Sequence, residues 1–383
     1  MGILLPNIIT FAWPMGAMTD YTVMGDTCAN ALGHTIISTA FLGKFMFLFA
    51  LLFGSGVIMY ARKFDSADHE GNYHTKLSTG TGLWYMRCGL LLVFGTLHAY
   101  LLWFGDILSF YAVAGLTLLW WIRRLHPKLQ FFGGLGLYAL GSLLVFGFSA
   151  LTYWALSAGH ITAEELSSDP AYEIAAYTGT YFDAFRARFI TTLFMEILFL
   201  PLMLPMLWGI MAMGMGLTRM GILTGERPLA FYVKAAIILL GIGIPLTGLA
   251  YVNIEHTFDL VPGFIWQSVA QPIGVPLGLG YAALVIALSK CASARLICIP
   301  LAAVGRMALT NYFLQTILCT TFFYGYGFGH YASIDFPRLW LVIAVVWSIN
   351  ILFSMLWLRF FTMGPFEWIW RVMTYRKLVA IRA

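Results

Sequence analysis

The sequence predicts an all-α, polytopic integral membrane protein with about ten membrane-spanning helices and both ends on the cytoplasmic side. Three observations support this prediction: the composition, the spacing of the apolar runs, and the alternation of basic residues between connecting segments. Of the 383 residues, 10% are charged and 60% are hydrophobic, and the mean hydropathy is +0.82. A soluble protein would carry about 25% charged residues. Lipid is the solvent that accommodates so much apolar surface.

Ten apolar runs divide the chain, and most supply the ~20 residues that a spanning helix needs. The first does not cover that length alone, because it starts at Met1 without a polar flank. The third and fourth are separated only by Phe104 and Gly105, which predicts a tight helical hairpin. No internal repeat or soluble segment interrupts the pattern, so residues 1–383 are expected to form a single membrane domain. The predicted helices are 2–15, 37–61, 83–103, 106–122, 130–156, 190–217, 229–252, 264–288, 298–325 and 339–358.

The connecting segments give an independent prediction of orientation, because cytoplasmic loops are enriched in Lys and Arg. Sixteen of the 22 basic residues fall on the inner side if the N-terminus is inside. The outer loops carry only Arg186, Arg188 and Arg338, together with most of the acidic residues. Ten helices then return the C-terminus to the cytoplasm. The inner basic residues are Arg62, Lys63, Lys76, Arg123, Arg124, Lys128, Arg219, Arg227, Lys234, Lys290, Arg295, Arg359, Arg371, Arg376, Lys377 and Arg382.

Several protein classes are disfavoured by the composition. The five cysteines show no paired spacing, so neither a disulfide framework nor a zinc site is expected. The first apolar run lacks a basic head and a small-residue cleavage site, so no cleavable signal peptide is expected. We expect the lipid bilayer as a partner, no nucleic acid, and no bound metal or cofactor.

The clearest candidate site lies in WYMRCGLLLVFGTLHAYLLWFGDILSFY, residues 84–111. Arg87 and His98 are eleven residues apart, or three helical turns, and project from nearly the same face. Asp106 opens the next helix just past the bend, so antiparallel packing would bring it close to His98. A histidine held by a carboxylate can serve as a general base near neutral pH. The structural alternatives are that the pair ties the hairpin together, that Asp106 caps a helix, and that Arg87 extends to lipid phosphate.

Other polar residues also lie within apolar runs, where ionisable groups are costly. Lys44 either extends to the outer surface or provides a counter-charge for Asp106 or Glu196. Glu196 has no evident local partner and is either protonated or paired. Arg306, Asn311 and Gln315 lie in GRMALTNYFLQTILCTTF; the two amides are one turn apart and either bond between helices or line a polar cavity.

With these residues in view, the chain resembles the YeiB-like family of bacterial inner-membrane proteins, whose function is unknown. The resemblance covers nearly the whole chain and places Arg306, Asn311 and Gln315 at family-typical positions, together with Glu367, Trp368 and Arg371. It implies a multi-pass protein of the bacterial inner (plasma) membrane. The segments that carry it are GILLPNIITFAWP, KFMFLFALLFGSG, LHAYLLWFGDIL, GRMALTNYFLQTILCTTFFY and NILFSMLWLRFFTMGPFEWIWRVMTY.

That family is similar in turn to membrane acyltransferases, which pass acyl groups from cytoplasmic acyl-CoA across the bilayer. Those enzymes have a D-x-x-R-G-type opening to the first helix, whereas this sequence begins Met1-Gly2-Ile3. The first helix is therefore expected to be truncated at its N-terminus. Many of them have a histidine farther along that helix, where this chain has Asn7, and asparagine cannot act as a base.

Two functions from different classes follow. In an acyltransferase-like enzyme, His98 and Asp106 would be catalytic, Arg87 would attract acyl-CoA, and Asn7, Asn311 or Gln315 would bind the developing oxyanion. A small-molecule acceptor would react near the outer face. In a transporter for a small solute, His98, Asp106, Glu196 and Lys44 would form a proton-coupled or gating network. A structural or regulatory subunit is a third interpretation, and assembly as a homodimer stays open.

Overall fold

The computed structural model describes residues 1–383 except 66–72, 163–168, 256–270 and 383. Its described part is helical, with an isolated bridge between Phe361 and Arg382 and no strand. Lipid explains this choice, because a helix satisfies its own backbone hydrogen bonds where water is absent. The helices are α1 (Leu4–Ala12), α2 (Cys28–Ala40), α3 (Lys44–Asp65), α4 (Tyr73–Leu101), α5 (Leu108–Ala114), α6 (Trp120–Ile122), α7 (Pro127–Ser157), α9 (Pro170–Thr178), α10 (Tyr181–Phe194), α11 (Leu200–Arg219), α12 (Leu229–Glu255), α14 (Val275–Lys290), α15 (Arg295–Arg306), α16 (Ala308–Phe323), α17 (Phe336–Trp357) and α18 (Pro365–Tyr375).

Six of the described helices are long and apolar enough to cross a membrane. A seventh span results if α15 and α16, which meet at an 86° bend, are counted together. Each predicted apolar run overlaps helix in the described residues, although 37–61 contains a turn at 41–43 and 83–103 extends past the end of its helix; residues 264–270 of the eighth lie outside the described residues. The count of ten stays a prediction, because α1 has only nine residues and 108–122 is a shorter apolar helix. The six spans are Cys28–Arg62, Pro127–Ser157, Tyr181–Arg219, Leu229–Tyr251, Gln271–Lys290 and Phe336–Trp357.

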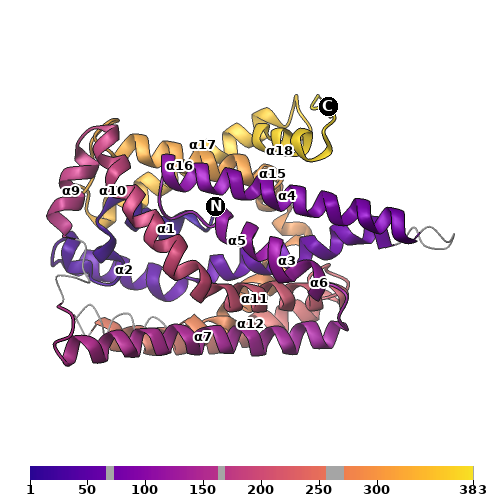
Figure 1. Ribbon diagram of the computed structural model, residues 1–383, viewed down its shortest axis with the longest axis horizontal. Helices are drawn as coiled ribbons and strands as arrows, with labels where there is room; N and C mark the ends of the chain where they lie inside the picture. The colour runs from indigo at the N-terminus through magenta and orange to yellow at the C-terminus, as the bar shows by residue number, and fades with distance from the viewer. Residues whose placement is uncertain (66–72, 163–168, 256–270, 383) are drawn as a thin grey trace.

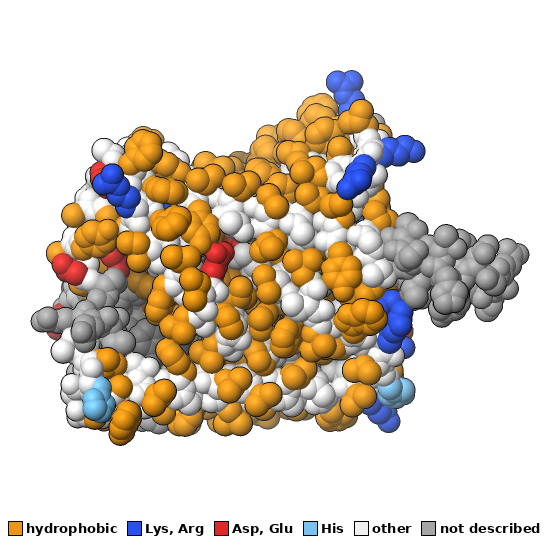
Figure 2. All heavy atoms as spheres, in the orientation of Figure 1, with side chains coloured by type: hydrophobic (Ala, Val, Ile, Leu, Met, Phe, Trp, Pro, Cys, Tyr) orange, Lys and Arg blue, Asp and Glu red, His pale blue; other side chains and the backbone are white. Residues whose placement is uncertain are grey.

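The long helices run roughly parallel, along the horizontal axis of Figure 1. The face shown in Figure 2 is covered by hydrophobic side chains, and Lys and Arg gather mainly at its right-hand end. Large apolar side chains such as Leu143, Ile237 and Leu341 are exposed along the helices. Such a surface would be an aggregation hazard in water and is the surface expected of a multi-pass membrane protein.

Close backbone approach holds α3, α7 and α11 together. A Cβ at Gly54 would lie 1.9 Å from the carbonyl oxygen of Met211, and one at Gly214 would lie 2.0 Å from that of Leu51. Gly134 and Gly209 make the same kind of approach between α7 and α11. Small residues permit this packing in lipid, where van der Waals contact replaces hydrophobic burial as the cohesive force.

The start of α16 is held by the amphipathic helix α18. The Glu367 carboxylate accepts hydrogen bonds from the backbone N–H groups of Leu309 and Thr310, at 2.7 and 3.1 Å. It also accepts the Thr310 hydroxyl at 2.5 Å, while that hydroxyl accepts the N–H of Phe366. A negative charge at the N-terminus of a helix is favourable because of the helix dipole. Glu367 therefore fixes α16 just beyond its bend with α15.

The C-terminal end of α4 is held by Arg188. The sequence assigned it to an outer loop, but it lies on α10 with 0% of its surface exposed. Its guanidinium donates to the carbonyls of Tyr100, Leu101 and Leu102, at distances of 2.8–3.0 Å. Tyr100 and Leu101 belong to the last turn of α4 and Leu102 follows it directly, where carbonyls have no helical partners. A cation is also favoured at the C-terminal end of a helix.

Replacing Arg188 by Met should lower the stability of the protein by about 3 kcal/mol or more, because charge-assisted hydrogen bonds contribute roughly 1.5–3 kcal/mol each. Unfolding in detergent, followed by circular dichroism, measures the change. The matched control is Arg186→Met, two residues away and exposed, which should stay within about 0.5 kcal/mol of the parent. Equal effects of the two substitutions would show that the carbonyl clamp does not stabilise the fold.

Candidate functional site

The hairpin between α4 and α5 creates the candidate site. Residues 102–107 leave the helix, and Trp103 fills the bend so closely that a Cβ at Gly105 would lie 2.2 Å from its ring. Any larger residue at that position would require the Trp103 ring to move. Asp106 follows, and its Oδ2 accepts the backbone N–H of Ser109 at 2.8 Å. The capping role considered from the sequence is therefore present, but it occupies only one of the two carboxylate oxygens.

The other oxygen of Asp106 faces His98. Nδ1 of the imidazole lies 3.1 Å from Oδ1, as an ion-pair contact whose angle falls short of an aligned hydrogen bond. Tyr312 on α16 donates its hydroxyl to the same Oδ1 at 3.3 Å. The side chains of His98 and Asp106 are almost completely buried, with exposures of 0% and 1%. The approach expected across the bend is thus present, and a third residue completes it from a distant helix.

Nε2 of His98 lies 2.9 Å from the hydroxyl of Thr316, one turn beyond Tyr312 on α16. The three side chains form a chain of contacts, from the Thr316 hydroxyl to the imidazole to the Asp106 carboxylate. A hydroxyl, a base and an orienting carboxylate in this order are the arrangement of nucleophilic and general-base catalysis. The aromatic rings of Tyr312 and Phe313 enclose the imidazole, with centroids 4.7 and 5.1 Å away.

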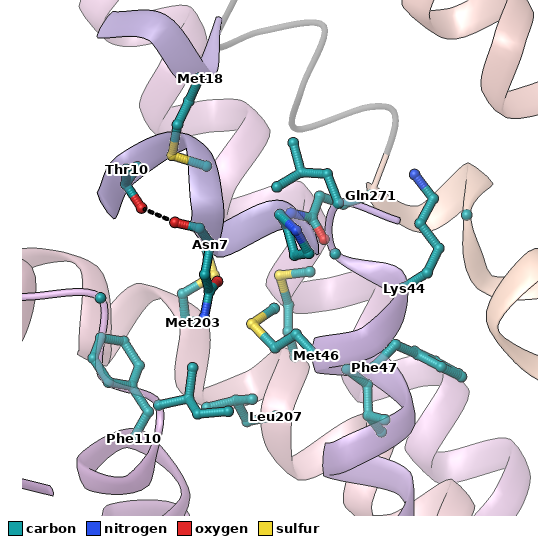
Figure 3. A pocket seen from close by; sticks show the side chains of 18 of the residues that line it. Asn7, Thr10, Met18, Lys44, Met46, Phe47, Phe110, Met203, Leu207 and Gln271 are labelled. Atoms are coloured by element: carbon teal, nitrogen blue, oxygen red, sulfur yellow. Dashed lines mark hydrogen bonds between the residues drawn. The ribbon is translucent and has the colours of Figure 1, made fainter. Parts of the chain in front are cut away.

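A cavity of about 300 Å³ lies next to this chain of contacts, at the low end of the size of ligand pockets. Asp106 forms part of its wall, whereas His98 lies behind Asp106. Figure 3 shows Met46, Met203 and Leu207 around the interior, with the Asn7 side chain pointing among them. Methionine adapts its shape readily, which suits an apolar ligand of variable form. The six methionines of the wall are Met15, Met18, Met46, Met195, Met203 and Met206.

Lys44 is the cation of the cavity wall. It is only 5% exposed, and its ammonium donates to the Ser38 carbonyl at 3.2 Å. Among the described residues no carboxylate lies within 4.0 Å of it, so it is not an ion-pair partner of Asp106 or Glu196. In Figure 3 its side chain runs away from Met46, which places the ammonium at the edge of the cavity.

The other predicted residues lie apart from His98. The Arg87 guanidinium stacks on Trp370 of α18 and on Tyr60, 4.2 and 5.2 Å from the ring centroids. Glu196 accepts the Tyr100 hydroxyl at 2.9 Å and lies in a π-helical turn, Met195–Phe199. Such turns are frequent at functional sites.

The polar residues of 305–322 face other neighbours. Arg306 donates to the carbonyl of Thr362 at 2.9 Å. Asn311 donates to Val304 and to Ser354 of α17, so the interhelical alternative describes it. Gln315 is buried one turn farther along α16. None of these three forms part of the cavity wall.

Thr316, Tyr312 and Gln271 were not identified from the sequence. Thr316 is separated from His98 by 218 positions. A threonine in an apolar helix usually bonds to its own helix backbone, as Thr316 also does with Tyr312 at 3.3 Å, so its residue type carries no signal. Gln271 follows the segment 256–270 and contributes to the cavity wall beside Lys44.

The fold and this site define a multi-pass helical membrane protein with a buried acid–base cluster beside an apolar cavity. Residues 217–377 match the family model described as "Protein of unknown function (DUF418)". The chain is 32% identical to uncharacterised protein YeiB of Escherichia coli (strain K12) over 402 aligned positions, covering 98% of this chain and 93% of YeiB. The chain belongs to this YeiB-like family.

Two further relatives are also uncharacterised. Protein YxaH of Bacillus subtilis (strain 168) is 29% identical and aligns over 98% of this chain and 91% of its own length. A 39.9 kDa protein encoded in the amylase 3′ region of Bacillus acidopullulyticus is 37% identical over 123 residues, covering 32% of this chain and 34% of its own. No solved structure matches significantly.

The contact between His98 and Asp106 should appear as an energetic coupling in a double-mutant cycle with His98→Asn and Asp106→Asn. Residues in one buried network couple by about 0.5–3 kcal/mol, and we expect at least about 1 kcal/mol here. Unfolding free energies in detergent measure the four corners of the cycle. Pairing His98→Asn with Asp183→Asn is the control, because Asp183 is exposed and bonds to Thr180. Additivity of both pairs would contradict the buried ion-pair contact.

Proposed function

We propose that the protein is an acyltransferase-like membrane enzyme, which moves an acyl group from a cytoplasmic donor to an acceptor near the outer face. The observation that carries this proposal is the chain of contacts from Thr316 through His98 to Asp106, buried beside a cavity. An imidazole can act as a general base when one nitrogen is held by a carboxylate and the other nitrogen can accept a proton.

In this mechanism His98 is the general base. Asp106 orients the ring through Nδ1, and the Thr316 hydroxyl occupies the position beside Nε2 that an acceptor hydroxyl or amine would take. The acceptor loses its proton to Nε2 as its oxygen or nitrogen attacks the thioester carbonyl of acyl-CoA; the C–S bond then breaks and the thiolate leaves. Asn7 at the cavity wall is the favoured donor to the oxyanion, because Asn311 is committed to Val304 and Ser354.

Access from the cytoplasm requires a long donor. Arg87 and His98 are eleven residues apart on α4, or ~16 Å along the axis. The pantetheine arm of acyl-CoA would bridge that separation, while the basic end of the protein would attract the phosphates of the CoA. Arg87 would attract the CoA phosphates from its position between the rings of Tyr60 and Trp370, which hold its guanidinium next to α18.

The proposal includes ten spans with both ends inside the bacterial inner membrane. Besides the six long spans and the bent pair, α1, α4 and the helix 108–122 would cross or enter the bilayer. The clustering of Lys and Arg at one end of the molecule in Figure 2 supports this orientation, because positive charge favours the cytoplasmic side.

A small-solute permease is the second candidate, and the turn between α2 and α3 favours it. The helix is interrupted at residues 41–43, and α3 begins at Lys44, beside the cavity. In many transporters the N-termini of interrupted helices point at anionic substrate groups. His98, Asp106 and Glu196 would then serve proton coupling instead of acyl transfer.

Purified protein in lipid, incubated with radiolabelled acetyl-CoA, tests the first candidate. We expect label in the protein or in a co-purified acceptor, reduced about 100-fold or more in His98→Ala, since a general base contributes 10²–10⁴-fold. His160→Ala is the control, because His160 is an exposed histidine outside the site. Absence of any transfer, with solute flux in proteoliposomes that depends on His98, would replace the enzyme with the permease.

A further inference from the structure

We propose that the cavity binds an amphipathic carboxylate, such as a medium-chain fatty acid, with its carboxylate held by Lys44, Ser38 and Gln271. These three residues are called the Lys44 corner below. The proposal concerns ligand recognition and holds whether the bound molecule is an acyl-transfer reactant, a transported solute or a regulator. Its test therefore fails or succeeds separately from that of acyl transfer.

The first step concerns unused hydrogen-bonding capacity at the Lys44 corner. The Lys44 ammonium has three donors, and it uses one on the Ser38 carbonyl. The Ser38 hydroxyl, on a side chain that is 1% exposed, has no hydrogen-bond partner in the part of the chain that the structure describes. Both residues belong to the cavity wall. Buried donors without acceptors are costly, so an acceptor bound in the cavity would stabilise this corner.

The second step brings Gln271 into the same corner. Gly43 has a φ of +77°, which turns the chain between α2 and α3, and a Cβ there would lie 3.0 Å from Oε1 of Gln271. The amide of Gln271 thus lies against the residue before Lys44. An ammonium, a hydroxyl and an amide N–H₂ are all donors, and together they match a group that carries several acceptor oxygens.

Charge then selects the kind of anion. Lys44 supplies one positive charge, whereas Asp106, which also lines the cavity, has both oxygens committed to His98, Tyr312 and Ser109. A single buried cation compensates a singly charged carboxylate. A phosphate monoester carries −1.5 to −2 and would leave uncompensated charge in an apolar site.

The remainder of the cavity selects the body of the ligand. Its wall is rich in methionines and aromatic rings, including Phe47 and Trp103, which provide apolar contact for an alkyl chain. The cavity volume of about 300 Å³ lies at the low end of the range for ligand pockets, which favours a ligand with a single alkyl chain. Decanoate is therefore a suitable probe.

Binding of decanoate, decanol and decyl phosphate to the purified protein in phosphatidylcholine nanodiscs tests the proposal by isothermal titration calorimetry. We expect decanoate to bind at least tenfold more tightly than decanol and than decyl phosphate. Lys44→Met should abolish the preference for decanoate over decanol, and Ser38→Ala should reduce it. Lys234→Met is the matched control, because Lys234 is an exposed lysine outside the cavity, and it should bind like the parent.

Thermal unfolding separates loss of the site from loss of the fold. Lys44 has no acidic partner among the residues that the structure describes, so removing its buried charge should not lower the melting temperature, and Lys44→Met is expected to melt at or above the parent. Decanoate should raise the melting temperature of the parent and leave that of Lys44→Met unchanged. If Lys44→Met does not fold, the comparison of decanoate with decanol on the parent protein decides alone.

Three results would overturn the assignment. The first is equal binding of decanoate and decanol to the parent protein. The second is undiminished decanoate binding by folded Lys44→Met. The third is tighter binding of decyl phosphate, or complete displacement of decanoate in phosphatidylglycerol nanodiscs, either of which would assign the corner to phosphate oxygens.

Discussion

Helix ends buried away from water impose the main physical constraint on this protein. A backbone carbonyl or N–H without a partner costs several kcal/mol in hydrocarbon, so each interruption of a helix near the membrane interior needs a side chain to complete it. Arg188 does this for the carbonyls at the end of α4, and Glu367 does it for the N–H groups at the start of α16. His98 lies one turn before the first of these ends, and Thr316 lies two turns after the second. The contact between His98 and Thr316 thus joins two helices that are each fixed by a charged residue.

Much of the helical framework follows from the sequence alone, because an apolar run in lipid has little choice but to form a helix. The hairpin could be predicted from Phe104 and Gly105, and the proximity of His98 and Asp106 from the seven residues between them. Both inferences depend on local chain geometry. Arg188 illustrates the limit, since a charge-count assigns it to an outer loop, whereas its function is to complete a helix 86–88 positions earlier in the chain.

Of the candidate site, only His98 and Asp106, which the hairpin provides, could be predicted from the sequence. Tyr312 and Thr316 reach it from α16, and no periodicity within either segment specifies which faces of α4 and α16 meet. Arg87 shows the opposite outcome: it shares a face of α4 with His98, yet it binds the aromatic rings of Tyr60 and Trp370 at a different depth. Lys44 could be singled out from its residue type alone. Its neighbours Ser38 and Gln271 could not, because they are brought near it only by the packing of α2, α3 and the residues just before α14.

The attachment of α18 to α16 has a mechanical consequence. Glu367 and Phe366 bond to Leu309 and Thr310, so rotation of α16 about its axis would break its contacts with the amphipathic helix α18. Thr316 is carried on the same rigid helix, less than two turns farther along. Displacement of α18 would therefore remove the contacts that fix the start of the helix on which Thr316, the partner of the buried imidazole, is carried.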